Sequence, residues 1–163
     1  MRRGEKGIFV VIALTVVLFA GINAYRHSQD SEPDLGIPFY SDAPQSLQDQ
    51  GAVLYKRLKC RDCHSLWGVR NPMQAVPAPS LDGIGSLRDE AWFYRYLSAP
   101  SPQDILPSRL KAKYQMPSYA DLPESERKIL AAYLASLKVE DWYLEEVRKA
   151  EYEKLTGKDY PAQ

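Results

Sequence analysis

The sequence predicts an all-α protein, in which one apolar N-terminal helix precedes a small helical domain. Three observations support this fold class. The chain runs from Gly7 to about Tyr25 without a charged residue, and apolar residues recur at helical spacing over residues 44–58 and again over residues 121–137. A β-α-β pattern is hard to find in the chain, so no parallel sheet is expected.

The N-terminal segment has the composition of a membrane-spanning helix. Arg2, Arg3 and Lys6 precede the apolar run, and about 19 residues at a rise of about 1.5 Å nearly match a hydrocarbon core of about 30 Å. The basic flank predicts that the N-terminus stays in the cytoplasm and that the rest of the chain is exported. We favour an uncleaved anchor over a cleaved signal peptide, because each candidate cleavage position near Ala20 pairs a small residue with a bulky one.

Composition divides the chain into four segments. They are an anchor at residues 1–25, a linker at 26–43, a helical domain at 44–138 and a charged extension at 139–163. The linker is predicted from its Ser, Asp, Glu, Pro and Gly content and its lack of periodicity. In the first helix of the domain, Gly51 lies between Leu47 and Leu54 at helical spacing. An internal helical glycine costs about 1 kcal/mol against alanine, which predicts a close packing partner there. The alternative is a glycine that is tolerated in a short exposed helix.

The pentapeptide Cys60-Arg61-Asp62-Cys63-His64 is the most specific motif in the chain. The spacing C-x-x-C-H is typical of haem c attachment, since it lets both sulfurs reach one edge of a porphyrin and brings the imidazole to the iron. A thioredoxin-like dithiol and half a zinc site are the alternatives. Both are disfavoured, because the chain has two cysteines and two histidines in all. We therefore expect one covalent haem c, with Cys60 and Cys63 as its thioether attachments and His64 as the proximal iron ligand.

Around this motif the chain resembles the class I, or mitochondrial-like, monohaem c-type cytochromes. The order from about Pro44 to Leu137 is a helix, C-x-x-C-H, a loop, an aromatic helix, a Met-Pro loop and a terminal helix. The resemblance implies that the stretch Ala78-Pro79-Ser80-Leu81 supplies a backbone carbonyl to the proximal histidine, with Pro79 packing near the haem. It also implies that Gly51 faces Tyr133 where the first and last helices cross.

A sixth iron ligand is expected, because a haem that transfers electrons works best with six-coordinate iron and methionine raises its potential. The chain has three methionines. Met1 starts the chain, and Met73 follows His64 too closely to reach the other face of the ring. Met116 is far enough along the chain and is followed by Pro117, as in the family's Met-Pro-x-Tyr pattern. We predict Met116 as the distal ligand, with a buried core methionine as the alternative.

The aromatic helix is predicted to start at Ser86-Leu87-Arg88-Asp89, which is close to a capping box, and to stop before Pro100. Trp92 and Tyr96 are four residues apart and share a face of this helix. We expect at least one of them to contact the haem. Packing against the other helices is the alternative.

The last helix of the domain, residues 121–137, has Pro123 in its first turn. The extension beyond residue 139 departs from the family pattern. It predicts an extra charged helix that ends near Gly157, with only a loose apolar stripe. A solvated strap on the outside of the domain is favoured over a contact with a partner subunit.

These observations predict single-electron transfer by a periplasmic cytochrome c that is anchored in the cytoplasmic membrane. The resemblance implies that haem is attached on the outer side of that membrane, which agrees with the export signal. The expected partners are redox proteins, and a subunit of a respiratory membrane complex is favoured over a free-standing anchored shuttle. A haem enzyme is disfavoured, since Met116 would fill the open iron position it needs. With zero formal net charge, nothing argues for nucleic acid.

Overall fold

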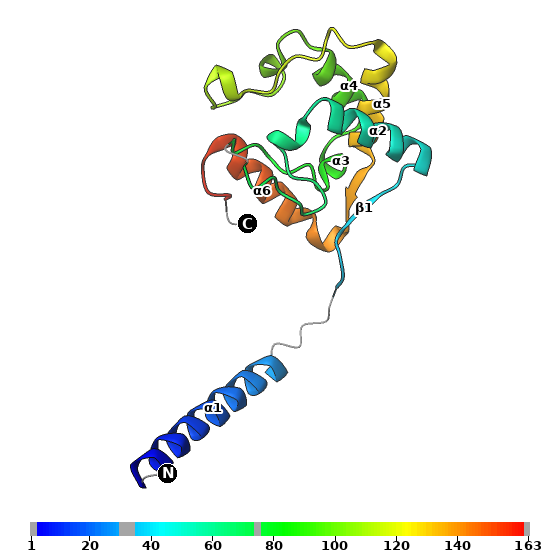
Figure 1. The fold of residues 1–163 in the computed structure, drawn as a ribbon. Coiled ribbons are helices and arrows are strands. Elements are labelled where there is room, and N and C mark those ends of the chain that lie inside the picture. The colour runs from blue at the N-terminus through cyan, green and yellow to red at the C-terminus, as the bar shows by residue number, and fades with distance from the viewer. Residues whose placement is uncertain (1–2, 30–34, 74–75, 162–163) are drawn as a thin grey trace. The chain divides into compact units, whose positions relative to one another are not determined.

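The protein is seen here in a computed structural model (Figure 1). It describes residues 3–29, 35–73 and 76–161. The chain divides into two compact units, Met1–Gly36 and Ile37–Gln163. The described residues are mostly helical, so the predicted fold class is confirmed. Part of the predicted linker, residues 30–34, lies outside the described residues.

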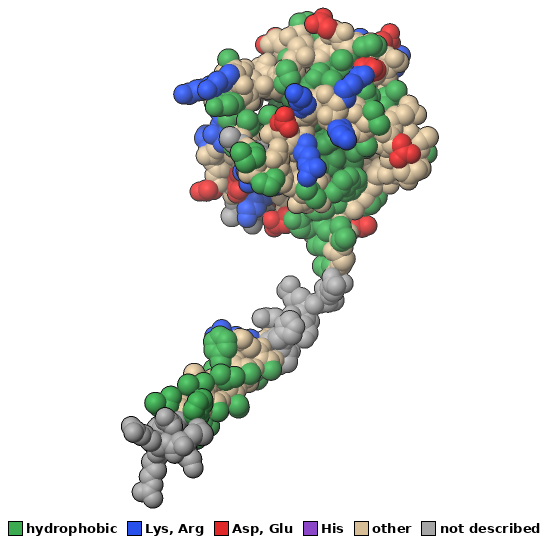
Figure 2. All heavy atoms as spheres, viewed as in Figure 1, with side chains coloured by type: hydrophobic (Ala, Val, Ile, Leu, Met, Phe, Trp, Pro, Cys, Tyr) green, Lys and Arg blue, Asp and Glu red, His purple; other side chains and the backbone are tan. Residues whose placement is uncertain are grey.

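The first unit contains one helix, α1, which spans Arg3–Gln29. Within it, Gly7–Arg26 has a mean hydropathy of 2.4 over 20 residues. Its large apolar side chains are exposed, and Figure 2 shows hydrophobic atoms along the helix. The length and composition of this helix suit a membrane span, and a signal sequence has the same properties.

The second unit is built from short helices and one two-stranded sheet. Its elements are β1 Phe39–Ser41, α2 Gln45–Arg57, η1 Cys60–Asp62, α3 Ile84–Leu87, α4 Glu90–Ser98, η2 Pro102–Asp104, η3 Ala112–Tyr114, α5 Glu124–Ala135, β2 Leu137–Val139, η4 Asp141–Tyr143 and α6 Leu144–Thr156. Leu97, Leu130 and Leu137 are the largest fully buried side chains of the core. Apolar residues from α2, α4 and α5 therefore meet in one core, which positions the loops between these helices.

Helices α2 and α5 pack closely at Gly51. A Cβ atom on Gly51 would lie 2.1 Å from Cγ of Tyr133, whose side chain is 3% exposed. The tyrosine ring therefore lies directly on the backbone of α2. The predicted pairing of Gly51 with Tyr133 is confirmed, and it accounts for a glycine in the middle of a helix.

Replacing Gly51 by alanine should lower the free energy of unfolding by about 3 kcal/mol, because the new methyl group overlaps a buried ring. In an exposed helix the same change would instead stabilise by about 1 kcal/mol, so the sign of the effect tests the contact. Urea unfolding of the holoprotein measures it. Ala52→Gly, at the exposed neighbouring position, is the matched control and should cost about 1 kcal/mol. A Gly51→Ala protein as stable as the wild type would contradict the packing.

The small sheet was not predicted. Strand β1 pairs antiparallel with β2, with Phe39 opposite Val139 and Ser41 opposite Leu137, and Ser41 Oγ lies 2.9 Å from Ser136 Oγ. Three-residue strands are too short to show a period of two in the sequence. The pairing ties the end of the predicted linker to the end of α5, so the compact unit begins before the predicted boundary at residue 44.

The predicted capping box at Ser86 is wrong. Ser86 lies in α3, and its hydroxyl accepts a hydrogen bond from the Val139 amide at 3.1 Å. Extended backbone at Arg88 separates α3 from α4. The N-cap of α4 is Asp89, whose carboxylate accepts from the Trp92 amide at 2.7 Å. Asp89, which was predicted to take the place of the Glu or Gln in the capping box, is therefore itself the N-cap.

The C-terminal extension forms α6, which ends at Gly157 in the left-handed conformation with φ of 69°, as predicted. It is not, however, a fully solvated strap. Val147 is 8% exposed, and its side chain lies beside Gly83 at the start of α3. The loose apolar stripe is thus sufficient to pack one face of α6 on the domain.

Candidate functional site

A cavity of about 330 Å³ lies within the second unit. Its wall contains all of the predicted site residues, which are Cys60, Cys63, His64, Pro79, Trp92, Tyr96 and Met116. Its volume falls in the usual range for small-molecule and cofactor sites, about 300 to 1,000 Å³. The fold therefore brings together these residues, from two helices and two loops, around one space.

The C-x-x-C-H motif forms a tight turn at the end of α2. Lys59 adopts a left-handed conformation with φ of 57° and ends the helix. The His64 amide then donates to the Cys60 carbonyl at 2.9 Å, and the Tyr55 hydroxyl donates to the His64 carbonyl at 3.2 Å. One turn of chain thus places Cys60, Cys63 and His64 on the cavity wall together.

His64 has the hydrogen bonding of a metal-binding imidazole. Its Nδ1 atom lies 2.7 Å from the Pro79 carbonyl oxygen. A carbonyl only accepts, so Nδ1 carries the hydrogen and Nε2 keeps its lone pair. Burial lowers the pKa of His64, although the bond to Pro79 opposes this effect. A neutral imidazole is the form that can bind a metal ion, and the bond to Pro79 fixes the orientation of the ring.

Both cysteines are present as thiols. Burial raises the pKa of the Cys60 thiol to about 11. Burial also raises the pKa of the Cys63 thiol, with a further contribution from the nearby Asp62. Both sulfurs are therefore protonated at neutral pH, and they lie on the same cavity wall as the histidine.

Asp82 organises the loop that carries Pro79, and sequence reasoning missed it. Its carboxylate is buried, 7% exposed, and accepts hydrogen bonds from the Trp67 amide, the Gly68 amide at 3.2 Å and the Ser80 hydroxyl at 2.8 Å. Trp67 and Gly68 both have positive φ, so this carboxylate satisfies the amides of a strained turn. The adjacent Ser80 and Gly83 were the only local signal for this role.

Replacing Asp82 by alanine should lower the free energy of unfolding by about 3 kcal/mol, because it removes the buried, charged acceptor shared by three donors. It should also loosen the Pro79 loop. Chemical unfolding of the holoprotein measures the first effect. Asp121→Ala, at an exposed position, is the control and should change stability by less than about 0.5 kcal/mol. Equal stability of the two variants would contradict this role of Asp82.

Met116 enters the cavity from the loop between η3 and α5. Its side chain is partly buried against the core. Gln103 donates to the Met116 carbonyl at 2.8 Å, and the Ser118 hydroxyl donates to the Ala99 carbonyl at 2.7 Å. These bonds tie the Met-Pro loop to η2 and to the end of α4. Met73, in contrast, is 87% exposed and is not part of the cavity wall.

The two aromatic side chains predicted to share a face stack on each other. The Trp92 and Tyr96 ring centroids are 4.9 Å apart with an interplanar angle of 14°. The Arg88 guanidinium lies 4.6 Å from the centre of the Trp92 ring. All three line the cavity, so α4 contributes two aromatic side chains to its wall.

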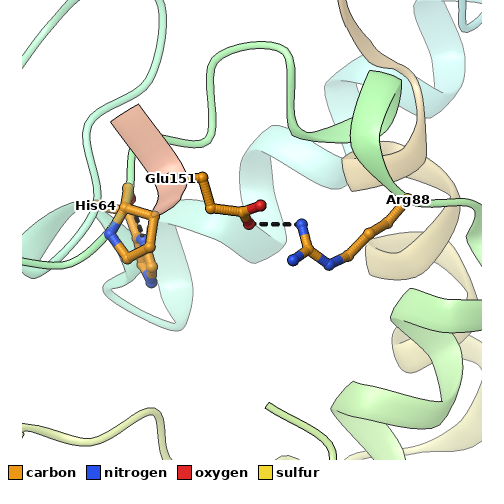
Figure 3. Close-up of polar contacts among 4 residues, drawn as sticks. His64, Arg88 and Glu151 are labelled. Atoms are coloured by element: carbon orange, nitrogen blue, oxygen red, sulfur yellow. Dashed lines mark hydrogen bonds and ion pairs between the residues drawn. The ribbon is translucent and has the colours of Figure 1, made fainter. Parts of the chain in front are cut away.

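Helix α6 also contributes to the cavity, through Glu151, Lys154 and Leu155. Glu151 forms an ion pair with Arg88 at 2.5 Å, and Figure 3 shows the two side chains pointing toward one another. Sequence reasoning missed this contribution. A glutamate on a charged helix carries no signal of its own, because its partner lies more than sixty residues away in the chain.

Comparison with protein-family models matches residues 48–138, more than half of the chain, to the family described as Cytochrome c. No curated protein and no solved structure matches the chain in the corresponding comparisons. The matched range begins in α2 and ends in β2. It includes every predicted site residue and leaves out both α1 and α6.

Proposed function

Because the chain belongs to the cytochrome c family, we propose that it transfers single electrons between redox proteins through one covalently bound haem c. The observation that carries this proposal is the cavity, whose wall joins both thiols of C-x-x-C-H, an imidazole with a free Nε2 lone pair, and a thioether sulfur. These donors are the ones that a class I haem c requires. Haem c, when bound, supplies a one-electron iron couple.

In this proposal each residue has one role. Cys60 and Cys63 attach the cofactor through thioether bonds, His64 binds iron through Nε2, and Met116 binds it through sulfur. Pro79 holds the imidazole ring in orientation through its carbonyl. The surrounding apolar side chains would keep water away from the bound haem.

The same proposal places the protein in the cytoplasmic membrane. Helix α1 acts as an uncleaved anchor, and the haem domain lies in the periplasm. Support comes from the apolar stretch Gly7–Arg26 and from the basic residues before it. N-terminal sequencing of the mature protein distinguishes an anchor, which begins at or near Met1, from a cleaved signal peptide, which leaves a new N-terminus near Ala24.

The favoured partners are other subunits of a respiratory membrane complex, and a free-standing anchored shuttle is the second candidate. The extension beyond the family match supports a subunit, because the exposed side of α6 adds surface beyond the matched domain. Native gel electrophoresis of mildly solubilised membranes separates the two. A haem-stained band far above the mass of 18.5 kDa supports a complex, whereas a band near the mass of one detergent-bound chain supports the shuttle.

The decisive experiment is expression of the full chain with a cytochrome c maturation system. We expect a haem-staining band that survives denaturing electrophoresis, remains with carbonate-washed membranes, and belongs to a protein with reversible one-electron reduction. A colourless mature protein would overturn the proposed function. A stained protein that washes off the membrane would overturn the anchor alone.

A further inference from the structure

Among the described residues, the ion pair between Arg88 and Glu151 is more buried than the other ion pairs of the second unit. The side chains of Arg88 and Glu151 are 16% and 15% exposed. The pair between Arg148 and Glu145 on α6 is about half exposed on both sides, at 52% and 48%. A charge that is withdrawn from water acts over a longer distance, because less solvent screens it.

The pair also occupies a defined place in the wall of the cavity. Arg88, Trp92, Glu151 and Leu155 line the main cavity and also line a second, more open groove of about 570 Å³. These four residues therefore form the partition between the candidate haem site and the outside. Figure 3 shows Glu151 reaching Arg88 from α6, with His64 in the same view.

Both charges are held in place by more than their mutual attraction. Arg88 lies against the Trp92 ring. Helix α6 is fixed by the burial of Val147 and by a hydrogen bond from Arg109 Nε to the Lys154 carbonyl at 3.2 Å. Glu151 thus faces the cavity because its helix is docked there.

We propose that Glu151 and Arg88 tune the midpoint potential of the haem, with Glu151 lowering it and Arg88 raising it. The inference rests on the proposed function and adds to it a role for the C-terminal extension, which lies outside the family match. Oxidation adds one positive charge at the iron. A nearby carboxylate stabilises that oxidised state, whereas a nearby guanidinium destabilises it. Neither Glu151 nor Arg88 is among the residues proposed to bind the iron, so both would act as charges in the cavity wall.

The test uses the full-length holoprotein and spectroelectrochemical titration. Glu151→Gln should raise the midpoint potential and Arg88→Gln should lower it. The double variant should fall between the two, because it removes both charges. Glu151→Asp, which keeps the charge, should lie closer to the wild type than Glu151→Gln does. Glu146→Gln removes a carboxylate from an exposed position of the same helix and should leave the potential unchanged.

A shift in Glu151→Gln no larger than that in Glu146→Gln would overturn the inference, and so would a shift in the same direction as that of Arg88→Gln. If Glu151→Gln does not mature, Arg88→Gln can be compared with the double variant, because these two proteins differ only in the Glu151 carboxylate. The double variant must then have the higher potential, and the opposite order would overturn the inference. A wild-type protein without covalent haem would instead refute the proposed function, so the two failures are distinguishable.

Discussion

Replacing Cys60 and Cys63 together by serine should abolish covalent haem attachment, with no haem-stained band after denaturing electrophoresis. A serine hydroxyl does not form the stable thioether bond, and the chain contains no other cysteine. Each single variant should retain one thioether bond and a stained band. Its reduced spectrum should shift to longer wavelength, because one vinyl group stays conjugated with the ring.

Met73→Ala is a useful control for maturation in that experiment, since Met73 is exposed and lies outside the cavity wall. It should stain as strongly as the wild type. A stained band in the double cysteine variant would show that the haem is attached elsewhere. That result would remove the chemical basis for assigning the cavity to haem c.

Replacing Met116 by alanine should produce the second large change, a fall in the midpoint potential. Thioether ligation raises the potential of a haem, and axial ligands together set haem potentials over about 0.8 V, so we expect a fall on the order of 0.1 V. The sulfur-to-iron charge-transfer absorption of the oxidised protein should disappear. Redox titration and absorption spectroscopy measure the two effects.

Met73→Ala is the matched control for this prediction as well, because it removes the same chemical group from an exposed position. It should leave both the absorption and the potential unchanged. Retention of the absorption in Met116→Ala would show that another residue is the ligand. Carbon monoxide should bind the reduced variant but not the reduced wild type. Tight binding to the wild type would favour the alternative of a haem enzyme with an open iron position.

The elements that sequence could predict are those whose signal is local. The motif from Cys60 to His64 specifies its own geometry, because a single turn of chain carries both thiols and the imidazole. The long helices follow from apolar periodicity. The contact between Gly51 and Tyr133 was predictable for two reasons. An internal helical glycine lowers helix stability and so indicates a close packing partner, and the resemblance to the family indicated that this partner is Tyr133.

The elements that sequence did not reveal depend on partners far away in the chain. Strands β1 and β2 have three residues each, too few for a pattern, and they pair across almost the whole domain. Asp82 and Glu151 are ordinary acidic residues in the sequence, and only the fold buries them beside specific donors. For the same reason α6 was predicted as a solvated strap, although one of its faces closes the cavity.

The docking of α6 also matters for anyone who isolates this domain by trimming the chain. A recombinant fragment limited to residues 48–138, the range of the family match, would lack Glu151 and Leu155 and would leave one side of the cofactor pocket open to solvent. It would also lack β1, the pairing partner of β2. Measurements on such a fragment would describe a protein whose cofactor is more exposed to water and whose midpoint potential differs from that of the full chain. Domain boundaries for this chain should therefore extend from Ile37 to Gln163.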